Sequence, residues 1–133
     1  MKKILIALMV LIATFALAEG GLTIQKHSEY GDYLADATNK TLYIFKNDVK
    51  DSGASTCYDA CIAAWPAYLV DSADYKSELA GNFSVITRTN DTYQLAYDGL
   101  PLYYFAGDPN AGDVNGQGVG EVWYIASYKA EAY

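Results

Sequence analysis

The chain has 133 residues, a formal net charge of −7 and two cysteines, which indicates one small acidic domain. This charge argues against nucleic-acid binding, because phosphate neutralisation requires clustered lysine and arginine side chains. At this length a chain can bury a hydrophobic core without depending on a disulfide.

The N-terminus has the pattern of a secretory signal peptide, residues 1–18. Lys2 and Lys3 precede an apolar run over residues 4–15, and Ala-Leu-Ala follows as a cleavage site before Glu19. The run is too short for a comfortable membrane span, although an uncleaved anchor is the alternative. Cleavage leaves seven basic against 16 acidic residues, a net charge near −9. We expect a periplasmic or secreted protein with no stable membrane anchor after cleavage.

The remaining chain, residues 19–133, is predicted to be a single β-rich domain. Two apolar runs flank the turn signal ATNK in residues 30–45, and two more flank TND in residues 83–97. Asp98-Gly99 lies between apolar stretches, which is a strong hairpin signal. A last aromatic and β-branched run lies in residues 121–128.

One segment differs from the strands. The stretch STCYDACIAAW, residues 55–65, is rich in alanine, with Ser55 or Thr56 as a candidate N-cap. Pro66 disfavours helical geometry at the residue before it. We predict a short helix over about residues 58–64.

A pattern of the form Leu-Tyr-x-Phe-x-x-Asp occurs twice, as LYIFKND (42–48) and LYYFAGD (102–108). A polar loop and a tryptophan follow each copy. The sequence therefore predicts two diverged repeats, about residues 30–70 and 83–128.

Strand periodicity suggests what the repeated motif does. Alternate residues of a strand share a face, so both the Tyr-Phe face and the opposite face are apolar. We therefore predict that each motif forms a central strand covered on both sides. Each Asp then lies just past the strand, where it can accept hydrogen bonds from loop N–H groups. A binding site made of aromatic rings and a carboxylate is the alternative. The motif residues are Tyr43, Phe45, Asp48, Tyr103, Phe105 and Asp108.

Four stretches carry a resemblance to a known family: YGDYLADATNKTLYIFKND, STCYDACIAAWPAYL, YDGLPLYYFAGD and GDVNGQGVGEVWYIAS. They resemble bacterial secreted repeats of unknown function, described as predicted lipoproteins with a Tyr-x-(Phe/Trp/Tyr)-x-x-Asp motif. The resemblance spans about residues 30–128. It implies paired repeats and an extracytoplasmic location, and it implies no settled activity. The lipidation cysteine that a lipoprotein requires is missing here.

Cys57 and Cys61 are the only cysteines. In an oxidising compartment we expect a disulfide between them, which requires a non-helical Cys57 because i and i+4 positions of a helix lie too far apart. The alternative is a copper site that joins both thiolates to His27, the only histidine. Free or redox-active thiols are a further alternative.

Other candidate chemistry is sparse. The loop after the second motif offers oxygen ligands for calcium, but neither an EF-hand nor a glycine nonapeptide spacing is present. The weak calcium candidates are Asp108, Asn110, Asp113 and Asn115. No nucleophile elbow or phosphate loop occurs, and a Ser-His-Asp arrangement would depend on the single histidine.

The sequence thus predicts an all-β fold, a small antiparallel sandwich or barrel of two related halves with one short helix. The predicted function is a secreted or periplasmic, non-enzymatic binding or structural module of the bacterial envelope. It needs no cofactor, and its ligand and its envelope or extracellular partner are unknown. The alternatives are a periplasmic copper-binding protein and, less favoured, a hydrolase that uses surface carboxylates.

Overall fold

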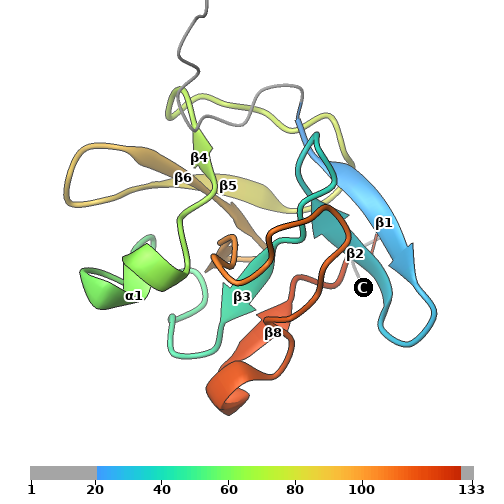
Figure 1. The fold of residues 1–133 in the computed structure, drawn as a ribbon. Helices are drawn as coiled ribbons and strands as arrows, with labels where there is room; N and C mark the ends of the chain where they lie inside the picture. Colours follow the sequence, from blue (N-terminus) through green and yellow to red (C-terminus); the bar gives the residue numbers. More distant parts are fainter. Residues whose placement is uncertain (1–20, 130–133) are drawn as a thin grey trace, which may run out of the picture.

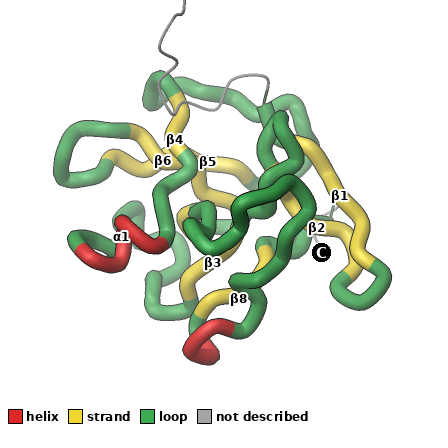
Figure 2. The backbone as a smooth tube through the Cα atoms, viewed as in Figure 1, coloured by secondary structure: helices red, strands yellow, loops and turns green. Residues whose placement is uncertain are grey.

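The computed structural model describes residues 21–129, so the predicted signal peptide at residues 1–18 lies outside the described residues. Most regular elements are strands, and they form antiparallel sheets (Figures 1 and 2). The strands are β1 (Thr23–His27), β2 (Gly31–Ala35), β3 (Tyr43–Phe45), β4 (Leu69–Val70), β5 (Phe83–Thr87), β6 (Tyr93–Tyr97), β7 (Leu100–Pro101) and β8 (Trp123–Ile125). The helices are α1 (Ala60–Ala64) and the 3-10 turn η1 (Val119–Glu121).

The architecture is sandwich-like and not a closed barrel. β1 pairs with β2, β3 pairs with β8, and β6 lies between β4 and β5 while also pairing with β7. A bridge between Tyr43 and Tyr103 joins the two halves, with reciprocal backbone hydrogen bonds of 2.7 and 3.0 Å. The predicted all-β fold with one short α-helix is confirmed.

The predicted turns are present. Around ATNK, the Asp36 N–H donates to the Lys40 carbonyl, and Leu42 donates to Leu34. β5 and β6 form the hairpin around TND. At the second hairpin, Asp98 and Gly99 have φ of 52° and 81°, the left-handed values that an Asp-Gly turn of this kind requires.

Two strands were not expected from the sequence. β1 has the burial pattern of a half-exposed strand, but its residues TIQKH lack the aromatic run that marks the others. β4 has two residues, too few for a periodic signal. Both gain their strand geometry from antiparallel pairing, β1 with β2 of equal length and β4 with the longer β6.

The helix begins later than predicted. Asp59, not Ser55 or Thr56, is the N-cap, and no side chain caps the helix. Asp59 has a φ of 54°, which breaks the backbone before Ala60 and places Cys57 outside the helix. The predicted N-cap residues bond elsewhere: Ser55 contacts Tyr103, and Thr56 contacts Asp48.

The two faces of the motif strands separate two hydrophobic clusters, as the alternation predicted. Tyr43, Phe45 and Tyr103 belong to one cluster, whereas Leu42 and Leu102 belong to the other. The first copy forms strand β3, whereas the second copy lies after β7 and, instead of forming a strand, makes isolated bridges from Tyr103 to Tyr43 and Ala67. Both copies are covered on both faces, and the first cluster contains both tryptophans.

Candidate functional site

The two copies of the motif exchange hydrogen bonds. The Tyr103 hydroxyl donates to Asp48 at 2.6 Å, and the Tyr43 hydroxyl donates to Asp108 at 2.5 Å. All four residues are buried. Each repeat therefore supplies the hydroxyl that the other repeat's carboxylate accepts.

The second oxygen of each carboxylate holds its own loop. Asp48 accepts the backbone N–H of Thr56 at 2.7 Å, and Asp108 accepts that of Asn115 at 2.9 Å. This is the loop clasp that the sequence predicted. The exchange of tyrosines was not predicted, because the spacing within one repeat gives no sign of which repeat supplies the partner.

A stack of four aromatic rings crosses from one repeat to the other. Trp65 and Trp123 are stacked at 3.9 Å between ring centroids, with 2° between their planes. Phe105 stacks on Trp65 and Phe45 stacks on Trp123, both at 4.1 Å. Each tryptophan thus packs against the phenylalanine of the opposite repeat.

The bridging tyrosines are held neutral. Burial, and then the hydrogen bond to Asp108, raise the pKa of Tyr43. Burial, and then the bond to Asp48, raise the pKa of Tyr103. Neither hydroxyl titrates near neutral pH, so neither is placed to act as a general base there.

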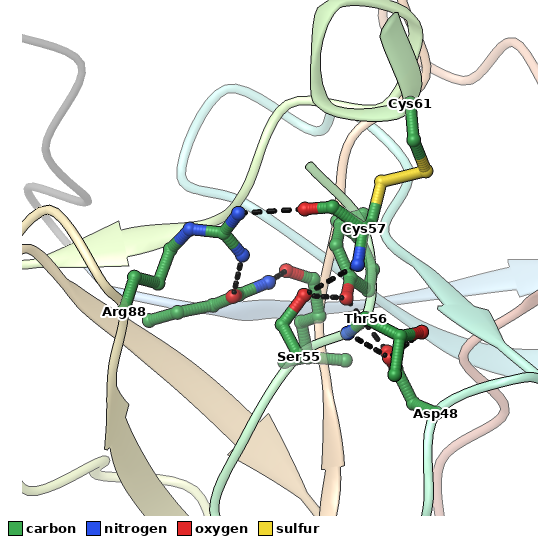
Figure 3. The surroundings of a disulfide bond; sticks show 9 residues. Asp48, Ser55, Thr56, Cys57, Cys61 and Arg88 are labelled. Carbon is green, nitrogen blue, oxygen red and sulfur yellow. Dashed lines mark hydrogen bonds between the residues drawn. A yellow bond between two sulfur atoms is a disulfide. The ribbon is translucent and has the colours of Figure 1, made fainter. Parts of the chain in front are cut away.

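The cysteines form the predicted disulfide, with Cα atoms 5.2 Å apart (Figure 3). Cys57 is fully buried, and its carbonyl accepts a 2.7 Å hydrogen bond from Arg88. Arg88 is the only arginine of the chain, and it also donates to Gln94 at 2.8 Å. It therefore ties the β5–β6 hairpin to the disulfide loop, a role that no local pattern around residue 88 indicated.

The alternative copper ligands do not meet in the structure. His27 stacks on Tyr30 and accepts the N–H groups of Glu29 and Tyr30 through Nδ1. Strand β1, which ends at His27, and helix α1 lie on opposite sides of the molecule (Figure 1). Within residues 21–129, no three His, Cys, Asp or Glu side chains form a group able to hold a metal ion.

Both carboxylates among the weak calcium candidates accept hydrogen bonds within the protein. Asp108 bonds Tyr43 and Asn115, and Asp113 accepts the Asn110 N–H at 2.9 Å. The Asn115 amide donates to the Gly107 carbonyl. The carboxylates of Asp108 and Asp113 therefore stabilise the conformation of the loop.

Two grooves lie at equivalent places of the two repeats, each lined by a residue from the middle of one motif copy. The first, the Lys40 groove, has a volume of about 410 Å³ and is lined by Asp36, Thr38, Lys40, Pro66, Tyr104 and Phe105, among others. The second, the Lys46 groove, has a volume of about 360 Å³ and is lined by Ile44, Lys46, Tyr97, Leu100, Tyr124 and Ile125, among others. Tyr104 and Ile44 occupy the same position of the motif.

The Lys40 groove is a built polar site. Asp36 accepts the Tyr104 hydroxyl at 2.7 Å, the Thr38 hydroxyl at 2.8 Å, and the N–H groups of Thr38 and Lys40. Burial opposes ionisation of Asp36, but these hydrogen bonds outweigh it and lower the pKa. Burial and the Asp36 bond raise the pKa of Tyr104. No local pattern indicated this site, because its residues lie in three stretches far apart along the chain: residues 36–41, Pro66 and residues 104–109.

Comparison with known proteins found one family. Residues 26–68 and 84–127 match the model of a family described as a secreted repeat of unknown function. The matched stretches are the two halves that exchange tyrosine and aspartate contacts. No curated protein and no solved structure matches the chain. In the described part of the chain, no helix has the length and apolarity of a membrane span.

Proposed function

Because the chain belongs to the family of secreted repeats of unknown function that matches both of its halves, we propose that it is a non-enzymatic binding module of the bacterial envelope. The duplicated motif serves as its scaffold, and the Lys40 groove serves as its ligand site.

The observation that carries this proposal is that the carboxylates and tyrosine hydroxyls of the motif are engaged in hydrogen bonds between the repeats. Each motif carboxylate has one oxygen on a tyrosine of the other repeat and the second on its own loop. A catalytic acid or nucleophile must be able to reach a substrate and change its bonding during the reaction. Groups that are buried and fully engaged in holding two repeats together favour a structural role.

We therefore assign ligand binding to a surface groove, the Lys40 groove. The Lys40 groove has the size of a small-molecule site, combines apolar walls with a few fixed polar groups, and is braced by four hydrogen bonds to Asp36. Fixed groups lower the cost of ordering on binding, so such a groove is suited to a ligand.

Amide NMR of the isotope-labelled mature protein tests the proposal. Three soluble probes are titrated to millimolar concentration: methyl glucoside, methyl glucuronide and trialanine. Saturable shifts at residues 36–41 and 104–108 with any probe support a binding module. The proposal fails if none of the three shifts these residues, or if the protein turns over chromogenic ester or glycoside substrates and loses that turnover on substitution of Lys40.

A further inference from the structure

We propose that the Lys40 groove is a saccharide site that takes a neutral, hydroxyl-bearing ring. This inference rests on the proposed binding function and names the ligand class of the same groove. It follows from the hydrogen-bonding capacity that the groove residues retain after their internal contacts are made.

Lys40 retains one donor. Its ammonium group donates to the carbonyl of Asp108 at 2.9 Å and to that of Pro109 at 3.3 Å. An ammonium group has three N–H donors, so one remains for a ligand. The salt bridge found within residues 21–129 joins Lys26 to Asp32, so Lys40 is held by carbonyls and not by a carboxylate.

Thr38 and Tyr104 retain acceptors. Both hydroxyl hydrogens are directed to Asp36, at 2.8 and 2.7 Å. A hydroxyl group has one donor and two acceptor lone pairs, so each oxygen can still accept a hydrogen bond from a ligand. Asp36 stays ionised because its pKa is lowered, which keeps both hydroxyl hydrogens directed inward.

The walls supply apolar contact. Pro66, Tyr104 and Phe105 line the groove and are half-buried. Phe105 is fixed by stacking on Trp65, and Tyr104 is fixed by its bond to Asp36. The C–H faces of a sugar ring can bury apolar area against these rigid surfaces.

The charges of Lys40 and Asp36 favour one class of ligand over the others that could bind in the groove. A sugar hydroxyl can accept from Lys40 and donate to Tyr104 or Thr38 at the same time. A carboxylate accepts from Lys40, but it offers no donor to the two hydroxyl oxygens and brings a second negative charge close to Asp36. A cation is repelled by Lys40. The neutral polyhydroxylated ligand is therefore the best match.

The Lys46 groove provides a matched control within the same chain. The Leu34 N–H donates to the Ala126 carbonyl, and the Leu95 N–H makes the corresponding bond to the Tyr68 carbonyl, so Leu34 and Leu95 are equivalent positions of the two repeats. Two residues further on, Asp36 in one repeat therefore corresponds to Tyr97 in the other. Ile44 replaces Tyr104, and Lys46 lies over the Tyr124 ring at 5.3 Å. This groove has a lysine, Lys46, and a carboxylate, Asp98, but Asp36 has no counterpart in it because Tyr97 stands at that position.

The test compares methyl glucoside with methyl glucuronide, which share a ring and differ by one carboxylate. We expect methyl glucoside to bind more tightly and to shift residues 36–41 and 104–108 in amide NMR. Lys40→Met should weaken this binding by about tenfold, as expected for one hydrogen bond to a charged group. Lys46→Met should leave it unchanged. If Lys40→Met melts far below wild type, Tyr104→Phe serves as the second variant, with an expected loss of about fivefold.

Three outcomes would overturn the saccharide site. They are tighter binding of the glucuronide, an equal loss in the Lys40→Met and Lys46→Met variants, and absence of glucoside shifts at the groove. If glucuronide or trialanine shifts the groove residues while methyl glucoside does not, the saccharide inference fails and the proposed binding function stands. If no probe shifts them, both fail.

Discussion

Tyr103 donates its hydroxyl hydrogen to Asp48, which lies 55 positions earlier in the chain and belongs to the other copy of the repeated motif. Tyr43 makes the same contact to Asp108 across 65 positions. The repeated motif is therefore a reciprocal clasp between repeats. It gives each half a buried hydrogen bond that the half cannot complete alone.

A double-mutant cycle measures this clasp. Asp48→Asn and Tyr103→Phe should each lower the free energy of unfolding by about 1–3 kcal/mol, because each leaves a buried polar partner unsatisfied. The double variant should be less destabilised than the sum of the two, since one interaction is lost twice. Urea unfolding gives the energies. Combining Asp48→Asn with Tyr43→Phe is the control, where we expect near-additive effects. Coupling of equal size in both cycles would contradict the exchanged pairing.

Tyr68→Phe should stabilise the protein. Among the described residues, the Tyr68 hydroxyl is the buried side-chain oxygen with no hydrogen-bond partner. Removing an unsatisfied polar group from a buried position avoids its desolvation cost, about 1 kcal/mol or more. Thermal melts of Tyr68→Phe and Tyr103→Phe should move in opposite directions. A lower melting temperature for Tyr68→Phe would show that the hydroxyl is satisfied in solution.

Stability should fall at alkaline pH. Burial, together with the bonds to Asp108 and Asp48, raises the pKa of Tyr43 and Tyr103. A raised folded-state pKa contributes stability that is complete below the unfolded-state value of about 10 and is lost as the pH rises above it.

We therefore expect the free energy of unfolding to decline above about pH 10. The decline should be shallower in Tyr103→Phe, which lacks one of the tyrosines with a raised pKa. Urea unfolding at a series of pH values measures it, and tyrosinate absorbance of the folded protein reports ionisation. Full tyrosine ionisation in the folded protein near pH 10 would refute the prediction.

Reduction of the disulfide should destabilise the protein modestly. Cys57 and Cys61 are four positions apart, so the closed loop is short and its contribution should lie below the ~3 kcal/mol of a fifteen-residue loop. Thermal melts of the Cys57→Ser/Cys61→Ser double variant measure this contribution. Unchanged melting would show that Arg88 and the Asp48 clasp hold the loop without the bond.

The copper-binding alternative is tested on Cys57, Cys61 and His27. We predict that anaerobic titration of the reduced protein with Cu(I) gives no tight one-to-one binding that depends on His27. The reason is that the described structure places His27 against Tyr30 rather than beside the cysteines. His27→Ala is the matched variant. Tight stoichiometric binding that weakens in His27→Ala would restore the copper alternative.

Export remains a prediction from the first 18 residues. Intact-mass spectrometry of the soluble extracytoplasmic fraction should find a chain that starts at Glu19. A full-length chain retained in the membrane would contradict cleavage. Fractionation of the periplasm from the medium distinguishes the two extracytoplasmic locations.

The sequence by itself determined the local structure of this protein. Alternation along the motif strands predicted two covered faces, and Tyr43 and Leu42 do lie in different clusters. The Asp98-Gly99 turn, the short helix and the Asp48 loop clasp also follow from residues close together in the chain. These features depend on steric preferences and hydrogen bonds that act over a few residues, so a single stretch contains their cause.

Only the tertiary structure decided which partner completes each contact. Tyr43 could reach an aspartate of either repeat as far as the motif spacing shows, and the fold selects Asp108. Likewise, Asp36 and Tyr104 meet across 68 positions and create a groove that neither segment encodes alone. Contacts at such separations depend on how the two halves pack together, and a duplicated pattern is equally compatible with pairing within a repeat and pairing between repeats.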